Sequence, residues 1–326
     1  MAESMRFRSA LFLQKAEVLA DQKEMVASRL GAALPDLTLH FAGSAEDVPE
    51  GLSVDIVIAP TLPWLPGALA RLGAYRWIHF LSAGVEKIWD MPFDKEGVLL
   101  TKSSGVHGAP MSEYAIGAML YFAKQFNRFA EQAREARWER TWLDELTGRT
   151  VMILGMGHIG GMVAERARVF GMDVIGVQRQ PRPARGDERI VALHAAPDYL
   201  SEVDYLVVCL PLTEATHHLV NRDFLGRLKP GAVVVDISRG GVVEEAAVVE
   251  ALESGQLKGA ALDVFERQPL PAGSALWRDS RVLVTPHVSG TSPHYMQRAL
   301  DVFVRNAKAL EAGEAPVTAV DVAAGY

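Results

Sequence analysis

The sequence predicts an α/β protein built from two doubly wound parallel sheets. Short apolar stretches of strand length alternate along the 326 residues with longer segments that have helical spacing. Buried strands that are continuously apolar and alternate with helices are typical of parallel sheets covered on both faces. The length also fits two domains, at about 100–200 residues per domain.

The expected elements form two series. The first has strands at 9–14, 37–42, 55–60, 76–82 and 98–103, and helices at 18–33, 65–73 and 112–138. The second has strands at 150–154, 173–177, 205–210, 232–237, 260–265 and 281–285, and helices at 160–170, 222–228 and 244–254. A last helix at 293–312 is expected to pack back on the first domain.

Composition excludes several classes of protein. The chain is 49% apolar and 22% charged, with 33 basic and 40 acidic side chains and a net charge of −7, which argues against a nucleic-acid binder. Its one cysteine, Cys209, excludes an internal disulfide and fits a reducing compartment. No stretch has the roughly 18 uninterrupted apolar residues of a membrane helix, and the first eight residues lack the apolar run of a signal peptide. We therefore expect a cytoplasmic protein with no membrane partner and no metal site.

A glycine-rich loop links the strand expected at 150–154 to the helix after it. The loop has the sequence Gly-Met-Gly-His-Ile-Gly. In dinucleotide-binding proteins the first glycine permits a tight turn, the second lets the backbone approach the pyrophosphate, and the third allows close helix–strand packing. N–H groups at the helix start hold the phosphates. The strand and helix around the loop favour this site over an ordinary turn; the expected contacts are Gly155, Gly157, His158 through its backbone, Ile159 and Gly160.

The end of the strand at 173–177 bears on which dinucleotide is bound. That strand usually ends in an acidic residue that binds the ribose hydroxyls of NAD. Here it is followed by Gln178, Arg179 and then Arg182. Guanidinium groups suit a 2′-phosphate, and no carboxylate is present to repel one. The segment predicts NADP as the preferred cofactor and leaves NAD open; a solvated basic loop is the alternative.

Two side chains that follow strands of the second series are candidates for chemistry. His287 follows the strand at 281–285, and Arg239 follows the strand at 232–237. Ligands of open α/β sheets bind beyond the carboxyl ends of the strands, so both are expected at the cofactor site. Imidazole suits protonation of a carbonyl oxygen, and a guanidinium suits a carboxylate substrate.

The other histidines carry weaker signals. His217 and His218 are neighbours on a helical pattern, so they are expected to point to different faces and to make a poor metal pair. The remaining ones are expected to be ordinary surface or satisfied core residues, or, for His107, weakly supported at the cleft: His40, His79, His107 and His194.

These residues, in this order, resemble the D-isomer-specific 2-hydroxyacid dehydrogenase family. The similarity extends over about two thirds of the chain and includes the glycine loop. It also includes Leu-Ser-Ala-Gly-Val-Glu at 81–86, Leu-Pro-Leu-Thr at 210–213, Ser-Arg-Gly-Gly at 238–241, Leu-Asp-Val-Phe at 262–265 and Pro-His-Val-Ser-Gly at 286–290.

The resemblance implies two flavodoxin-like domains with a cleft between them. The dinucleotide-binding domain, expected at 105–287, is inserted into a substrate domain made of 1–104 and 288–326. The family is typically dimeric through its nucleotide domains, so a homodimer is expected. Trp138, Trp142 and Trp277 are candidates for the substrate pocket or, alternatively, for the core.

The resemblance also implies residue roles. His287 is the general acid/base, Arg239 binds the carboxylate and carbonyl of the substrate, and the backbone amides of Ala83 and Gly84 hold the carboxylate. Further cofactor contacts are implied at Leu210, Pro211, Ile237, Ser238, Asp263, Ser289 and Gly290.

The chain departs from the family at one catalytic position. The glutamate that hydrogen-bonds the histidine, five positions after the aspartate of Leu-Asp-Val-Phe, is replaced here by Gln268. An amide orients an imidazole without supplying a full charge. Glu266 matches a different glutamate of the family, and a local shift that brings it nearer to the histidine stays open.

The expected activity is NADPH-dependent reduction of a small 2-oxoacid to the D-2-hydroxyacid, most similar to glyoxylate/hydroxypyruvate reductases. With a glutamine at position 268, the sequence also resembles formate dehydrogenases of the same superfamily. The segment 103–113, however, lacks the asparagine with which those enzymes hold formate. A dinucleotide-sensing regulator is a third alternative, which the lack of long tails or a charge run disfavours.

Overall fold

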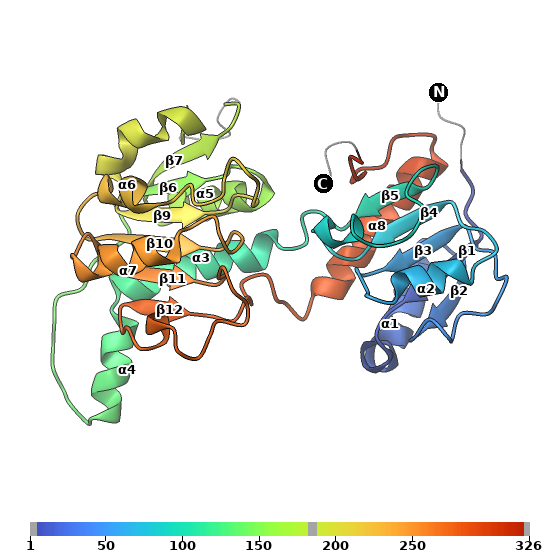
Figure 1. Ribbon diagram of the computed structural model, residues 1–326, viewed down its shortest axis with the longest axis horizontal. Helices are drawn as coiled ribbons and strands as arrows, with labels where there is room; N and C mark the ends of the chain where they lie inside the picture. Colours follow the sequence, from blue (N-terminus) through green and yellow to red (C-terminus); the bar gives the residue numbers. More distant parts are fainter. Residues whose placement is uncertain (1–4, 182–187, 323–326) are drawn as a thin grey trace. The chain divides into compact units, whose positions relative to one another are not determined.

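The computed structural model describes residues 5–181 and 188–322. The chain forms two compact units. Unit 1 comprises Met1–His107 and Ser292–Tyr326, and unit 2 comprises Gly108–Thr291. Each unit is built on its own sheet (Figure 1), and every strand pair in both sheets is parallel. The predicted fold class, two doubly wound α/β domains, is confirmed. Within the described ranges, no helix combines the length and hydrophobicity needed to cross a bilayer.

The sheet of unit 1 has five strands in the order β2-β1-β3-β4-β5, one of the common doubly wound orders. Its strands are β1 (Ser9–Leu13), β2 (Thr38–Ala42), β3 (Ile56–Ala59), β4 (Trp77–Phe80) and β5 (Leu99–Lys102).

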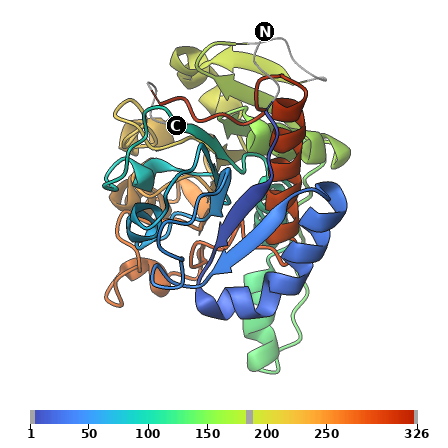
Figure 2. The ribbon, with the colours of Figure 1, turned by 90° about the vertical axis from the view of Figure 1, so that its right-hand side faces the viewer.

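Helices cover both faces of this sheet (Figure 2). Helices α1 (Ala16–Ala33) and α8 (Tyr295–Glu311) pack on one face, and α2 (Leu65–Ala70) packs on the other. The buried residues of α8 recur every three or four positions, as in an amphipathic helix. Arg29 Nε of α1 donates to Asp301 Oδ1 of α8 over 2.9 Å. The expected return of the last helix to the first domain is confirmed.

The sheet of unit 2 has seven strands in the order β12-β11-β10-β9-β6-β7-β8. Six of them reproduce the dinucleotide-binding order, and β12 extends the edge next to β11. Its strands are β6 (Thr150–Leu154), β7 (Asp173–Gln178), β8 (Arg189–Ala192), β9 (Tyr205–Val208), β10 (Ala232–Asp236), β11 (Leu257–Leu262) and β12 (Val282–Val284).

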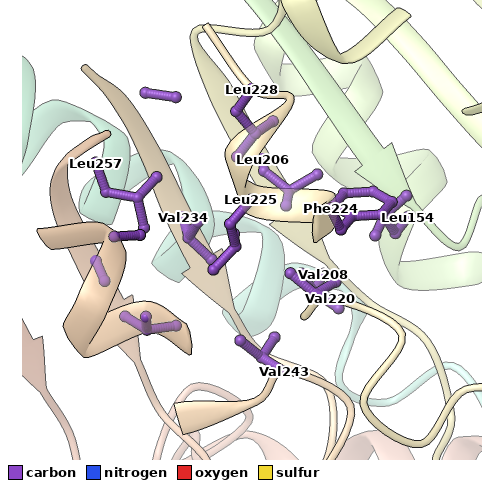
Figure 3. Close-up of a cluster of buried hydrophobic side chains, with 14 of the residues drawn as sticks. Leu154, Leu206, Val208, Val220, Phe224, Leu225, Leu228, Val234, Val243 and Leu257 are labelled. Atoms are coloured by element: carbon purple, nitrogen blue, oxygen red, sulfur yellow. The ribbon is translucent and has the colours of Figure 1, made fainter. Parts of the chain in front are cut away.

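Two hydrophobic clusters fill the space between this sheet and its helices. On one face lie α3 (Gly108–Ala123) and α5 (His158–Val169), and on the other lie α6 (Arg222–Gly226), α7 (Glu245–Glu253) and the 3-10 helix η2 (Leu193–Glu202). Figure 3 shows part of the second cluster, with side chains from β6, β9, β10 and α6 packed together. Two shorter 3-10 helices are η1 (Glu86–Ile88) and η3 (Ala275–Trp277).

The prediction of a single long helix at 112–138 is wrong. The chain instead forms α3 and then α4 (Phe126–Arg134), because Gln125 adopts a left-handed backbone with φ 50° and ends the first helix. Lys124 fixes the break, since its Nζ donates to the carbonyl of Asp144 over 2.7 Å. The apolar first half is buried, whereas the polar second half extends away from the sheet (Figure 1).

The segment after α4 leaves large aromatic side chains uncovered. Trp138 and Trp142 are each 95% exposed, and Phe126, at the start of α4, is 53% exposed. The alternative that these two tryptophans are core residues is therefore wrong. Trp277 is half exposed, and its Nε1 donates to the carbonyl of Pro271.

Candidate active site

The glycine loop at 155–160 joins β6 to α5. Gly155 has φ 100°, and a Cβ on Gly160 would lie 2.1 Å from the carbonyl oxygen of Gly155. Only glycine fits these two positions, because the backbone is left-handed at the first and helix and strand touch at the third. A Cβ on Gly157 would meet nothing within 4 Å among the described residues. The loop is therefore tightly packed at Gly160, whereas there is space beside Gly157 among the described residues.

The start of α5 presents free donors. The N–H of Gly161 is the first that is paired, with the carbonyl of Gly157 over 2.9 Å. The four preceding N–H groups have no acceptor in the part of the chain that the structure describes. Such donors at a helix start suit phosphate groups. The ring of His158 lies against Gly108, where an added Cβ would come within 2.4 Å of Nε2, and Ile159 is half-buried.

The end of β7 lies beside this loop. Gln178, its last residue, donates from Nε2 to the carbonyl of Met156 over 3.3 Å. The next residue, Arg179, is exposed and makes no ion pair within 5–181 and 188–322. Arg182, the second predicted phosphate ligand, lies outside the described residues.

The loop after β9 is shaped by a buried threonine. The hydroxyl of Thr216 donates to the carbonyl of Pro211 over 2.7 Å and accepts from the N–H of Thr213 over 2.8 Å. Leu210 packs against the core, and Pro211 is exposed at the sheet edge.

The prediction that His217 and His218 point to different faces of a helix is wrong. These residues form a turn rather than a helix, and His218 has φ 48°. Their rings therefore stack, with centroids 4.0 Å apart, instead of pointing to different faces. His218 Nε2 lies 3.2 Å from Glu266 Oε1.

Arg239 follows β10 at the carboxyl edge of the sheet. It is exposed, and its Nη1 donates to the carbonyl of Ser238 over 2.9 Å. Beneath it, Asp236 Oδ1 accepts from the Ser238 N–H over 2.9 Å and from the Ser238 hydroxyl over 2.5 Å. Burial raises the pKa of the Asp236 carboxyl to about 7. Ile237 and Ser238 are both buried, so the strand end is rigid under the exposed guanidinium.

Gly240 lets this loop touch the loop after β11. A Cβ at Gly240 would lie 1.8 Å from the carbonyl oxygen of Phe265, so no larger residue fits without movement of the backbone. The loop that carries Arg239 is therefore in direct contact with the loop that carries Gln268.

Asp263 organises the loop after β12. It is fully buried; its Oδ1 accepts from the Thr285 hydroxyl over 2.6 Å and from the Val288 N–H over 2.8 Å. Its Oδ2 accepts from the Ser289 N–H over 2.9 Å, and its own carbonyl accepts from the His287 N–H over 2.9 Å. The carboxylate thus holds the backbone that follows His287 and the side chain of Thr285 that precedes it. Gly290, also a predicted cofactor contact, is half-buried at the end of this turn.

His287 is exposed at the apex of this turn, with φ 55°. Its Nδ1 lies 3.0 Å from Gln268 Oε1. Gln268 Nε2 donates to the carbonyl of Phe265 over 3.2 Å, so the amide oxygen faces the ring. Because that oxygen only accepts, the neutral imidazole carries its proton on Nδ1 and leaves Nε2 bare.

Gln268 and not Glu266 contacts His287, so the alternative of a local shift is wrong. Glu266 Oε1 lies near His218 and accepts from the N–H of Glu245 over 3.4 Å, and the Glu266 N–H donates to Glu245 Oε1 over 2.6 Å. The carboxylate and the backbone N–H of Glu266 are therefore both hydrogen-bonded to Glu245 at the start of α7.

The sequence did not point to a further pair behind Asp263. Tyr114 of α3 lies 2.7 Å from the Thr285 hydroxyl, which donates its own proton to Asp263. Burial raises the pKa of Tyr114 to about 12, so the phenol stays protonated and donates to Thr285. The two residues are 171 positions apart, and no local pattern joins them.

In unit 1, Ala83 and Gly84 lie in the loop after β4. Both are half-buried, and neither N–H has an acceptor among the described residues. The loop is held by Ser103, whose N–H donates to the carbonyls of Phe80 over 2.9 Å and Ser82 over 3.1 Å.

The strand order, the glycine loop and the open helix start define unit 2 as a dinucleotide-binding α/β domain. The D-isomer specific 2-hydroxyacid dehydrogenase NAD binding domain matches residues 116–289. Glyoxylate/hydroxypyruvate reductase A of Serratia proteamaculans is 31% identical over 311 residues, which are 88% of this chain and 98% of that protein. The chain belongs to the D-isomer-specific 2-hydroxyacid dehydrogenase family, and unit 2 carries its NAD-binding domain.

Solved structures agree with this assignment. A family protein from Aeromonas salmonicida has 32% identity and a TM-score of 0.84, over 96% of this chain and 99% of that one. A family member from Xanthobacter autotrophicus, in complex with NADPH and MES, has 31% identity and a TM-score of 0.81, over 98% and 100%. An NADPH-dependent glyoxylate/hydroxypyruvate reductase from Sinorhizobium meliloti, in complex with NADP and sulfate, has 27% identity and a TM-score of 0.81, over 98% and 100%.

Two glycine substitutions separate folding from dinucleotide binding. Gly160→Ala is expected to lower the free energy of unfolding by about 1–3 kcal/mol, because its Cβ would overlap the Gly155 carbonyl. Gly157→Ala has room for its Cβ, so it should keep the melting temperature and weaken NADPH binding, since a pyrophosphate approaches at this position. Thermal unfolding and fluorescence titration with NADPH measure the two effects. Equal melting losses in the two variants, or undiminished NADPH binding by Gly157→Ala, would contradict these roles.

Proposed function

We propose that this chain reduces a small 2-oxoacid of the glyoxylate or hydroxypyruvate type to the D-2-hydroxyacid, with NADPH as the preferred cofactor. The observation that carries the proposal is the bond from His287 to Gln268 at the sheet edge that also bears Arg239. The reductases from Serratia and Sinorhizobium support the substrate class. We place the activity in the cytoplasm on compositional grounds, because the single cysteine suits a reducing compartment.

The proposed chemistry divides between the two exposed side chains. When bound, the reduced nicotinamide supplies the hydride for the carbonyl carbon. The imidazolium of His287 gives its Nε2 proton to the carbonyl oxygen, while Nδ1 stays bonded to Gln268. Arg239 has one guanidinium nitrogen held by Ser238, and its other donors bind the carboxylate and the carbonyl oxygen.

The proposed domain roles follow from the family. Unit 2 binds the dinucleotide through its glycine loop, with Leu210, Pro211, Ile237, Ser238, Asp263, Ser289 and Gly290 as the further cofactor residues. Unit 1 is the substrate domain, in which the N–H groups of Ala83 and Gly84, without an acceptor in the described part of the chain, suit the substrate carboxylate.

A second candidate is oxidation of formate. It is favoured by Gln268, because a neutral amide beside the histidine suits a reaction that transfers no proton. The absence of an asparagine at 103–113 ranks it second. A screen of oxoacids with NADPH and NADH, together with formate and the oxidised cofactors, distinguishes the two.

The preference for NADPH is expected to depend on Arg179. The guanidinium follows the end of β7 and has no ion-pair partner within 5–181 and 188–322. A charge-assisted bond to phosphate is worth about 1.5–3 kcal/mol. Arg179→Ala should therefore reduce the ratio of kcat/KM for NADPH over NADH by roughly tenfold or more. Arg189→Ala is the matched control, because Arg189 is an exposed arginine at the other end of the β7–β8 pair and is bonded to Glu202. No oxoacid turnover by the unmodified enzyme would contradict the function, and equal use of both cofactors would contradict the role of Arg179.

A carboxylate at position 268 is expected to shift the pH profile of the reduction. The reduction needs imidazolium, so its rate falls at pH values where the His287 ring is neutral. A carboxylate beside the ring favours the charged form, whereas an amide supplies a hydrogen bond without the charge. Gln268→Glu should move the falling limb of kcat/KM to higher pH and slow oxidation at neutral pH. Glu266→Gln, which alters a carboxylate away from His287, should not. Superimposable profiles for Gln268→Glu and the unmodified enzyme would show that the amide is electrostatically silent.

We further propose a homodimer formed through unit 2, with the segment from α4 to Leu143 at its interface. Phe126, Trp138 and Trp142 are more than half exposed there. Covering four indoles across a two-fold interface buries on the order of 600–1,000 Å², a large part of the roughly 1,200 Å² at which stable interfaces begin.

Replacing both tryptophans is expected to dissociate the dimer. The double variant Trp138→Ser/Trp142→Ser should sediment as a monomer at concentrations where the unmodified chain sediments as a dimer. The protomer itself should stay folded, because neither side chain is buried within it. Trp277→Phe, which changes a half-exposed tryptophan elsewhere, should leave the dimer intact. A monomeric unmodified chain, or a dimeric double variant, would contradict the proposed interface.

A further inference from the structure

A hydrogen-bond network of buried polar side chains joins β4 and β5 of unit 1. His79, Thr101 and Ser103 have no exposed surface. The ring of His79 lies between the two hydroxyls, with Nδ1 2.7 Å from Thr101 Oγ1 and Nε2 3.1 Å from Ser103 Oγ. Trp77 Nε1 donates to Thr101 Oγ1 over 2.8 Å. Each side chain of this network has its hydrogen-bond partners within unit 1.

The direction of these hydrogen bonds is set by Ser103. Its hydroxyl donates its one proton to the carbonyl of Phe80 over 3.1 Å, so it accepts from His79 Nε2. A neutral ring that is protonated on Nε2 leaves Nδ1 as an acceptor, so Thr101, which accepts from the Trp77 indole, donates to Nδ1. Burial lowers the pKa of His79 to about 3, which keeps the ring neutral and this direction fixed at physiological pH.

The Ser103 hydroxyl ends this network on the carbonyl of Phe80. By holding the Ser103 side chain, the network fixes the residue whose backbone N–H donates to the carbonyls of Phe80 and Ser82 in the loop after β4. The Tyr295 hydroxyl of α8 donates to the carbonyl of Leu81 in the same loop. The Ser82 carbonyl shares a trans peptide plane with the N–H of Ala83, and the two groups point in opposite directions. Holding the carbonyl inward therefore aims the Ala83 N–H outward, and a bonded carbonyl makes that N–H a stronger donor.

We propose that His79 is a positioning residue for substrate binding, acting through Ser103 on the peptide that joins Ser82 to Ala83. This inference rests on the proposed function, in which the Ala83 N–H binds the carboxylate of the oxoacid. A residue with this role affects the binding of the oxoacid and not the binding of the dinucleotide, because the contacts of His79 lie wholly in unit 1.

The test compares variants that break the hydrogen-bond network with one variant that preserves it. His79→Leu and Ser103→Ala should each raise KM for the oxoacid about tenfold, with kcat and KM for NADPH little changed, as expected for a contact equally strong in ground and transition states. His79→Gln, whose amide can accept from Thr101 and donate to Ser103, should return KM to within about threefold of normal. Ile78→Val, a change in the neighbouring core residue, should lower the melting temperature without moving the ratio of the two KM values.

Hydrogen exchange of the Ser103 amide supplies a readout that does not depend on turnover. Its protection should fall at least about tenfold in His79→Leu and be retained in His79→Gln, since the hydroxyl and the amide of Ser103 hold the same loop. Unchanged KM for the oxoacid in His79→Leu and Ser103→Ala, or unchanged exchange in His79→Leu, would overturn the positioning role. Absence of oxoacid reduction by the unmodified enzyme would instead overturn the proposed function, and the exchange comparison would still decide whether His79 acts on the loop.

Discussion

The carboxylate of Asp263 holds together the turn that carries His287. It accepts three hydrogen bonds, from the N–H groups of Val288 and Ser289 and from the hydroxyl of Thr285, at 2.6–2.9 Å. A buried carboxylate is costly unless such donors surround it, so the turn has one favourable conformation. His287 has a left-handed backbone there, φ 55°, which the surrounding bonds stabilise. The exposed imidazole is therefore held in place by the buried hydrogen bonds of Asp263 beneath it.

The two units share one physical arrangement at the carboxyl ends of their parallel strands, where a buried polar group fixes a loop. Asp263 does this in unit 2, and Ser103 does it in unit 1. Because the buried group satisfies the inward side of each loop, the outward side carries the His287 ring in unit 2 and, in unit 1, the N–H groups of Ala83 and Gly84, which have no acceptor among the described residues. Rigid support of this kind suits a site that must hold a small, charged substrate.

The periodicity of the sequence predicted the sheets well, because buried parallel strands and their helices have distinct apolar patterns. The placement of Arg239 and His287 at one edge of the sheet was predictable for a related reason, since residues that follow parallel strands share that edge. The break at Gln125 was not predictable, because it depends on a contact from Lys124 to the distant Asp144. The choice of Gln268 over Glu266 also depended on tertiary structure: Glu266 is drawn away by His218 and Glu245. Sequence spacing alone contains neither contact.

His287 presents a bare Nε2 because its Nδ1–H is bonded to Gln268. Nitrogen-15 NMR of the histidine-labelled enzyme, at a pH where the His287 ring is neutral, tests this tautomer most directly, since the two ring nitrogens have distinct shifts in each tautomer. The geometry predicts that the proton of neutral His287 is on Nδ1. A neutral His287 that carries its proton on Nε2 would contradict the claim, because Gln268 Oε1 would then face a nitrogen with no proton to donate.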